Sequence, residues 1–112
     1  EDRFLGYSLM LGARGALIGM GAALPDVQAA LLRAYAGGEW ARFLALSDIC
    51  DRFAQVTFVE PMEGYIRRML WAAAADGALP AEACEDPWGP DLPQAERLAV
   101  ERMVEHVRSS AG

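Results

Sequence analysis

A short apolar run between glycines constrains this chain more than any other feature. Residues 12–25 read Gly-Ala-Arg-Gly-Ala-Leu-Ile-Gly-Met-Gly-Ala-Ala-Leu-Pro. The continuous apolar stretch over residues 16–21 is typical of a buried strand, and helical patterns flank it. A lone strand cannot satisfy its own backbone groups, so we expect its partners to come from polypeptide outside this sequence. A complete sheet within the chain, or a helix at these residues, would contradict that interpretation.

Length and composition narrow the classes of protein. A chain of 112 residues is one domain at most, and 54% apolar residues supply a core. The net charge of −6 argues against non-specific binding to nucleic acid. No apolar run reaches the roughly 18 residues of a membrane span, and no signal peptide is recognisable. Cys50 and Cys84 are too far apart for a CxxC pair, so we expect reduced, buried thiols in a cytoplasmic protein.

The remaining sequence is predominantly helical. We expect a mostly α chain as it stands, with about five helices and one short strand, although the helix–strand–helix start is the pattern of an α/β fold. Glycines and prolines mark the boundaries. The expected helices cover residues 2–11, 25–36, 39–58, 62–76 and 92–107, with a single helical turn between Pro80 and Cys84.

Apolar stripes and caps make these expectations specific. The third helix carries one stripe at three- and four-residue steps, and the last helix carries another. Asp91 with Gln94 three residues later is the pattern of a capping box. Gly12 and Gly77 are the expected C-terminal caps of their helices. The first stripe is Phe43, Leu46, Cys50, Phe53 and Thr57, with Trp40 and Leu44 widening the same face. The second is Ala95, Leu98 or Ala99, Met103 and Val107.

Several residues could have catalytic or ligand-binding roles, but a structural or surface role is favoured for each of them. The Glu and Arg residues around Pro61 could form a carboxylate–guanidinium site, but an ion pair between Glu63 and Arg67 on one helix face is favoured. His106, the sole histidine, is expected at the surface near a helix end. The tryptophans are expected in the core or an interface rather than a ligand site. Residues 19–21 lack the pattern of a phosphate-binding loop.

Six motifs, in order and spacing, resemble the C-terminal part of the dihydrodipicolinate synthase and N-acetylneuraminate lyase family. The stretch that begins at Gly12 resembles the last barrel strand of that family, and the others resemble its helical extension. The motifs are Gly12–Pro25, Gly37–Ala41, Phe58–Pro61, Tyr65–Arg68, Asp76–Pro80 and Asp86–Pro90.

The resemblance implies a (β/α)8 barrel followed by a helical extension, in a protein that is usually a homotetramer. Residues 1–36 would be the last barrel segment, with strand eight and helix eight, and residues 37–112 the extension. The family forms an imine between pyruvate and a lysine on strand six, assisted by a tyrosine on strand five. Those residues would precede Glu1, and the family uses no cofactor or metal in this step.

The residue inventory agrees with that placement. Imine catalysis needs an amine nucleophile, whereas all ten basic residues here are Arg. Active sites of such barrels lie at the C-terminal ends of the strands. Only Asp2, which lines up with a family acid that holds substrate hydroxyls, and the strand exit at Gly21 and Ala22 could reach the site. Plain helix capping is the equal alternative for Asp2.

Some positions depart from the family pattern. Ile18 and Ala22 stand where the family has Ser and Asn, and Gly21 stands where some sugar-acid lyases carry a bulky residue at the mouth. Arg3 replaces the second acid of the lyases. These differences argue against a substrate of the sialic-acid type.

The sequence thus predicts the C-terminal segment of a pyruvate-dependent class I aldolase or lyase, inactive alone. Because it begins at Glu1 with an amphipathic pattern already running, we expect a piece of a longer protein. Its expected partners are the upstream barrel strands, further copies of the protein, and a small oxo-acid in the full enzyme, but neither nucleic acid nor membrane. The alternatives are a non-enzymatic helical module that self-associates, and one half of a split enzyme.

Overall fold

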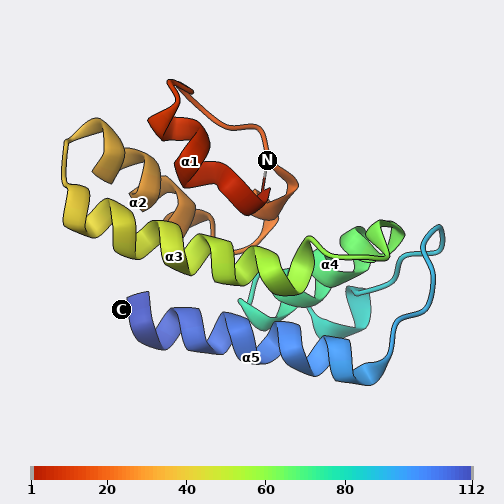
Figure 1. The fold of residues 1–112 in the computed structure, drawn as a ribbon. Helices are drawn as coiled ribbons and strands as arrows, with labels where there is room; N and C mark the ends of the chain where they lie inside the picture. Colours follow the sequence, from red (N-terminus) through yellow and green to blue (C-terminus); the bar gives the residue numbers. More distant parts are fainter. Residues whose placement is uncertain (1, 112) are drawn as a thin grey trace.

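Five α-helices carry most of the regular structure in a computed structural model, which describes residues 2–111 (Figure 1). Short 3-10 turns precede or connect them, at Asp2–Phe4, Gly19–Ala22, Met62–Gly64 and Ala81–Ala83. The mostly α class expected from the sequence is confirmed. The helices are α1 (Leu5–Met10), α2 (Pro25–Ala36), α3 (Trp40–Thr57), α4 (Tyr65–Ala75) and α5 (Gln94–Ala111).

Local signals set most of these boundaries. Pro25 occupies the first position of α2, where its missing N–H leaves no hydrogen bond unmade. Gly12 and Gly77 follow α1 and α4 with φ values of +108° and +86°, a conformation that favours glycine. The expected helical turn after Pro80 is also present, at Ala81–Ala83.

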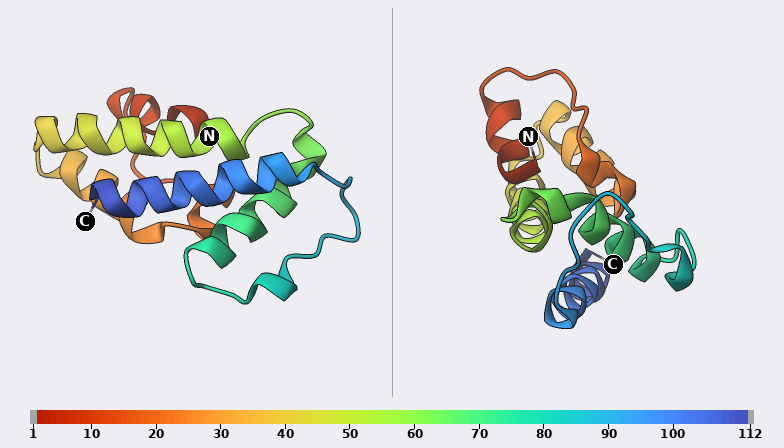
Figure 2. Two further views of the ribbon diagram at one scale, coloured as in Figure 1. Left: turned by 90° about the horizontal axis from the view of Figure 1, so that it is seen from below. Right: turned by 90° about the vertical axis from the view of Figure 1, so that its right-hand side faces the viewer.

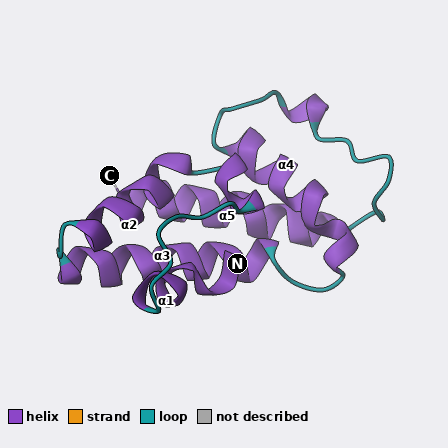
Figure 3. Ribbon diagram, turned by 90° about the horizontal axis from the view of Figure 1, so that it is seen from above, coloured by secondary structure: helices purple, strands orange, loops and turns teal. Residues whose placement is uncertain are grey.

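The expected strand at residues 16–21 is wrong. Residues 13–18 form an irregular segment, which is extended at Ile18 (φ −134°, ψ 141°), and Gly19–Ala22 then forms a short 3-10 helix. A helix at residues 16–21 is one of the two outcomes that contradict the barrel-strand interpretation, and the structure has one at residues 19–21. Figure 3 draws the stretch from α1 to this short helix as a loop, and no strand occurs among residues 2–111. The physical reason is the absence of a partner strand, because an extended segment gains no ladder hydrogen bonds alone.

Helix α3 is the element around which the others pack. It contacts α1, α2 and α5, and Figures 1 and 2 show it between the two N-terminal helices and α5. The five residues of its expected stripe, from Phe43 to Thr57, are all buried. Helical periodicity therefore predicted this stripe correctly, but Trp40 and Leu44, expected to widen the same face, are more than half exposed.

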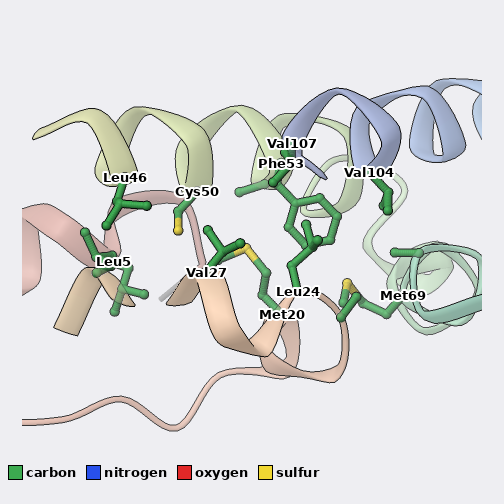
Figure 4. Packing of buried hydrophobic residues seen from close by; sticks show 14 of the residues in the cluster. Leu5, Met20, Leu24, Val27, Leu46, Cys50, Phe53, Met69, Val104 and Val107 are labelled. Atoms are coloured by element: carbon green, nitrogen blue, oxygen red, sulfur yellow. The ribbon is translucent and has the colours of Figure 1, made fainter. Parts of the chain in front are cut away.

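The core is continuous from the N-terminal helices to α5. Met20 and Leu24 lie beneath α3 near Phe53 in Figure 4, and all three side chains are at most 1% exposed. Val104 and Val107 of α5 belong to the same cluster. The expected division between residues 36 and 37 coincides with the turn between α2 and α3, and the core extends across it.

Two expectations for α5 need correction. Its fully buried positions are Val100, Val104 and Val107. The expected stripe is therefore right at Val107 and partly right at Met103, which packs against the core, but its earlier positions are exposed. The helix begins at Gln94, and the Asp91 side chain is fully exposed two residues before Pro93. Asp91 therefore does not cap α5, because Pro93 and Leu92 separate it from the first helical residue.

Candidate functional site

The turn at Gly19–Ala22 contains two of the three residues that the sequence assigned to substrate binding. The Gly21 N–H donates to the Ile18 carbonyl (3.2 Å) and the Ala23 N–H to the Met20 carbonyl (3.3 Å). The buried Gln28 side chain then donates from Nε2 to both the Met20 and the Ala23 carbonyls, at 2.9 Å each. One amide group thus holds both sides of the turn.

Charged groups fix the end of this turn to three helices. The Leu24 N–H donates to Asp76 Oδ2 (3.1 Å) at the end of α4, and Leu24 adopts a left-handed conformation (φ 53°). Arg108 of α5 donates to Asp76 at 2.6 Å and 2.8 Å and to Asp26 of α2 at 2.7 Å and 2.9 Å. The entry to α2 is thereby tied to the ends of α4 and α5.

The hydrogen bonds among Asp26, Asp76 and Arg108 shift the pKa values of Asp26 and Arg108. The hydrogen bonds from Arg108 lower the pKa of Asp26 below its usual 3.8. Hydrogen bonds to Asp76 and then to Asp26 raise the pKa of Arg108 above its usual range. Both shifts favour the charged forms, so Asp26 and Arg108 stay ionised at neutral pH.

Close packing explains why glycine occupies the start of the turn. A Cβ atom at Gly19 would lie 2.8 Å from Cε2 and Oη of Tyr65, which is closer than non-bonded atoms approach. The Tyr65 ring itself packs edge-on against Phe58, with centroids 5.6 Å apart. Two aromatic rings therefore fill the space behind the turn and leave no room for a side chain at residue 19.

The outer side of the turn is open. Gly21 is half-buried and Ala22 is exposed. A groove of about 250 Å³ runs beside them, with Ala16, Leu17, Ile18, Pro25 and Gln28 among its other lining residues. Residues 18–24 carry no acid, base or nucleophile. The turn can form part of the wall of a binding site, but it cannot perform acid–base or covalent chemistry.

The third expected site residue lies outside the described side chains. The backbone of Asp2 begins the first 3-10 turn, and the described side chains start at Arg3, which forms an ion pair with Asp51 of α3 (3.2 Å). The structure brings Gly21 and Ala22 together. The proximity of the Asp2 carboxylate to them stays a prediction.

The favoured ion pair between Glu63 and Arg67 is wrong. Arg67 donates instead to the Asp86 carbonyl (2.9 Å) and the Pro90 carbonyl (3.1 Å) of the connection before α5. Its carboxylate partner, 3.9 Å away, is Asp91. Helical spacing alone suggested the pair, whereas the unpaired carbonyls of a proline-rich loop offered Arg67 a larger set of acceptors.

Arg68 is fully buried and has four acceptors. Its Nε donates to Glu96 Oε1 of α5 (2.9 Å), and Nη1 donates to the Val59 (2.8 Å) and Pro61 (3.1 Å) carbonyls. Its Nη2 donates to the Glu60 carbonyl (3.4 Å). The guanidinium group therefore holds the turn between α3 and α4 against α5, which is a structural role rather than a catalytic one.

The other residues considered from the sequence are dispersed. His106 is exposed on α5 as expected, and Trp71 is buried. Trp40 and Trp88 are 57% and 92% exposed, so the core interpretation fails for both. Cys50 and Cys84 are buried and unpaired, and burial raises the pKa of Cys50 to about 11. Such a thiol is a poor nucleophile at neutral pH.

Sequence reasoning missed the residues that hold the turn. Gln28 is polar on the buried face of α2, and a buried amide requires hydrogen-bond partners, so its position was a usable signal. The contacts between Asp26, Asp76 and Arg108 span up to 82 residues. No local sequence pattern predicts a contact between residues so far apart in the sequence.

No family model, curated protein or solved structure matches the chain. Across the described residues, no helix combines the length and the apolar character needed to cross a bilayer. The same residues contain no cluster of three His, Cys, Asp or Glu side chains that could hold a metal ion.

Proposed function

We propose that this chain is the C-terminal segment of a pyruvate-dependent class I aldolase or lyase, and that it is inactive without the preceding barrel strands. The observation that carries the proposal is the segment that ends at Ile18. Its last three residues, 16–18, are apolar, its backbone is extended at Ile18, and Leu17 is fully exposed. An apolar side chain of this size gains about 1.5–3 kcal/mol from burial, so the segment fits a place between strands better than a place in water.

The position of the segment supports the same proposal. It follows α1 and precedes α2, as the last strand of a (β/α)8 barrel lies between its last two helices. The turn at Gly19–Ala22 leaves only residues 16–18 of the strand first expected and shifts the pairing region to residues 13–18. Within the proposal, Gly21 and Ala22 then form the wall at the C-terminal end of that strand, where the active sites of such barrels lie.

The chemistry of the full enzyme would use an amine from upstream. In such enzymes a lysine amine adds to the ketone carbon of pyruvate and water leaves, which gives an imine. The sequence from Glu1 to Gly112 contains no Lys. The contribution of this chain is therefore to complete the barrel and to shape the site, and the small oxo-acid meets its backbone and apolar side chains.

A fusion experiment tests this function. The chain is joined after strands one to seven of a pyruvate aldolase of this family, and the fusion is treated with labelled pyruvate and borohydride, which reduces the imine to a stable amine. We expect the fusion to be labelled on the donor lysine and the chain alone to carry no label on an internal residue. Internal labelling of the chain alone, or a folded fusion without label, would contradict the proposal.

Two matched substitutions test whether labelling of the fusion depends on residues 13–18. Leu17→Glu should prevent labelling of the fusion, because a charge would lie in the sheet, while the isolated chain keeps its stability since residue 17 is exposed. Leu98→Glu, at an exposed position on α5, makes the same chemical change away from the segment and should leave labelling intact. Equal labelling of the two fusions would exclude residues 13–18 as a barrel strand.

A further inference from the structure

An ordered loop before α5 presents a tryptophan to solvent. Trp88 is 92% exposed, yet the loop that carries it is tightly held. Arg67 donates to the carbonyls of Asp86 and Pro90 on either side of Trp88, and the Trp88 N–H donates to Asp86 Oδ1 (3.0 Å). A preorganised loop loses little conformational entropy on binding, and tryptophan is enriched among residues that dominate interfaces.

Packing next to Trp88 fixes the loop further. A Cβ atom at Gly89 would meet the Asp86 carboxylate and would lie 2.9 Å from the Glu63 carbonyl. Prolines at positions 87, 90 and 93 restrict the backbone on both sides. The indole therefore projects from a rigid support, and its exposure does not come from a loose loop.

The opposite end of the molecule carries an apolar groove of about 400 Å³. Its lining residues are Met10, Tyr35, Trp40, Phe43 and Leu44. The rings of Tyr35, Trp40 and Phe43 pack edge to face or tilted, with centroids 5.2–6.3 Å apart. Met10, Trp40 and Leu44 are each more than half exposed. The groove thus offers aromatic and aliphatic surface to another ring.

The loop and the groove cannot meet within one chain. The molecule measures 41 × 26 × 20 Å, and Figure 1 places the turn between α2 and α3 at the left end and the loop before α5 at the right end. Trp88 of one copy can, however, reach the groove of another copy. We propose that this chain associates head to tail, with Trp88 of one copy seated in the groove of the next.

The charges at the two ends are complementary. Glu63, Glu85 and Asp91 are exposed beside the Trp88 loop, and the Arg67 guanidinium group there donates to loop carbonyls. Arg33 and Arg42 are exposed in the helical turns that carry Tyr35 and Trp40, accompanied by Glu39. An acidic end therefore faces a basic end in head-to-tail association, and the long-range attraction weakens with salt.

The geometry determines the form of the assembly. Two different surfaces meet, so the contact is heterologous and leaves a free loop and a free groove at the ends of each assembly. A tryptophan buries about 150–250 Å², and the contact is much smaller than a standard interface. We expect weak association that grows with concentration and passes beyond a dimer, or closes into a ring. This inference does not depend on the barrel proposal.

Sedimentation of the 112-residue chain and two variants tests the association. Trp88→Ala removes the inserted ring, and Leu44→Glu places a charge in the groove. Both positions are exposed, so thermal melts should match the wild type. We expect the wild-type average mass to rise with concentration up to about 1 mM, a range suited to weak binding. Each variant alone should associate about 30-fold more weakly, as expected for a dominant interface residue.

Mixing the variants gives the decisive result. Trp88→Ala keeps an intact groove and Leu44→Glu keeps an intact loop, so a mixture should form 1:1 dimers that grow no further. Leu98→Glu, on α5, should associate as the wild type does. A wild-type chain that stays monomeric, variants that associate as strongly as the wild type, or a mixture that forms no dimer would each overturn the proposal.

Discussion

The two ends of the sequence handle their polar and apolar groups in opposite ways. In the C-terminal part, from α3 to α5, the largest fully buried side chain is the charged Arg68. Its guanidinium group donates hydrogen bonds to four acceptors. In the N-terminal part, large apolar side chains remain in water. Of the ten large apolar residues that are exposed in the described part of the chain, five lie within residues 4–17 and the other five are spread over residues 40–98. The five in the N-terminal part are Phe4, Tyr7, Met10, Leu11 and Leu17.

This contrast indicates where exposed apolar surface is most concentrated along the chain. A buried charge with every partner present needs nothing more from outside. A cluster of exposed apolar side chains, by comparison, marks a surface that other polypeptide covers. The N-terminal part is nevertheless anchored, because Met20 and Leu24 insert into the common core. The inner side of the N-terminal part is therefore packed against the core, and its outer side is exposed to solvent and free to contact other polypeptide.

The largest effect should come from the buried guanidinium group. Arg68→Met keeps similar bulk but leaves the carbonyls of Val59 and Pro61 and the Glu96 carboxylate without their donor. Removing one member of such a buried set lowers the free energy of unfolding by about 3–5 kcal/mol. Urea unfolding measures the change.

An exposed arginine provides the matched control. Arg52 of α3 pairs with Asp48 on the helix surface, with 56% of its side chain exposed. Arg52→Met should change the free energy of unfolding by no more than about 0.5 kcal/mol. If the two Arg→Met variants differed by less than about 1 kcal/mol, the C-terminal part would not depend on its buried charge, and the contrast drawn above would fail.

The next effect separates the two sides of the N-terminal part. Met20 and Leu17 lie three residues apart, yet Met20 is 0% exposed and Leu17 is fully exposed. Met20→Ala should lower the free energy of unfolding by about 2–5 kcal/mol. Leu17→Ala should change it by less than about 0.5 kcal/mol. Denaturant unfolding of both variants at one protein concentration provides the comparison, and similar values for the two would show that the segment does not have a packed and an open side.

Helical periodicity, together with the prolines and glycines at helix ends, predicted the elements that depend on residues close together in the sequence. The stripe of α3, Pro25 at the start of α2 and Gly77 after α4 each follow from residue type and spacing. The conformation of residues 16–21 could not be predicted in this way, because a strand needs hydrogen-bond partners that can come from any other part of a protein. Their conformation in the absence of such partners is decided by glycine and by the burial of Met20.

The candidate site was predictable only in part. Gly21 and Ala22 share one turn because they are adjacent in the sequence, and their role in substrate binding stays a prediction. The Asp76 and Arg108 side chains that fix the end of this turn come from distant helices. The Arg67 contacts were mispredicted for the same reason, because carbonyls of the loop at residues 86–90 compete with the nearby Glu63. An arginine with five donors selects acceptors by geometry, and sequence spacing does not supply that geometry.

The smallest effect concerns the link between the two parts, where Arg108 joins Asp26 and Asp76. The Arg108 hydrogen bonds hold the pKa of Asp26 below 3.8, so the stabilisation is complete above that pH and is lost as the pH falls through the lowered pKa. Because 63% of the Asp26 side chain is exposed, Asp26→Asn should lower the free energy of unfolding by only about 0.5 kcal/mol at pH 6. Urea unfolding at pH values from 6 down to 3 should show this difference shrinking below pH 3.8. The substitution should have no effect in an Arg108→Gln background, since the partner is already absent. A difference that persisted in that background would assign the stabilisation to the position of Asp26 at the start of α2 rather than to the link between the two parts.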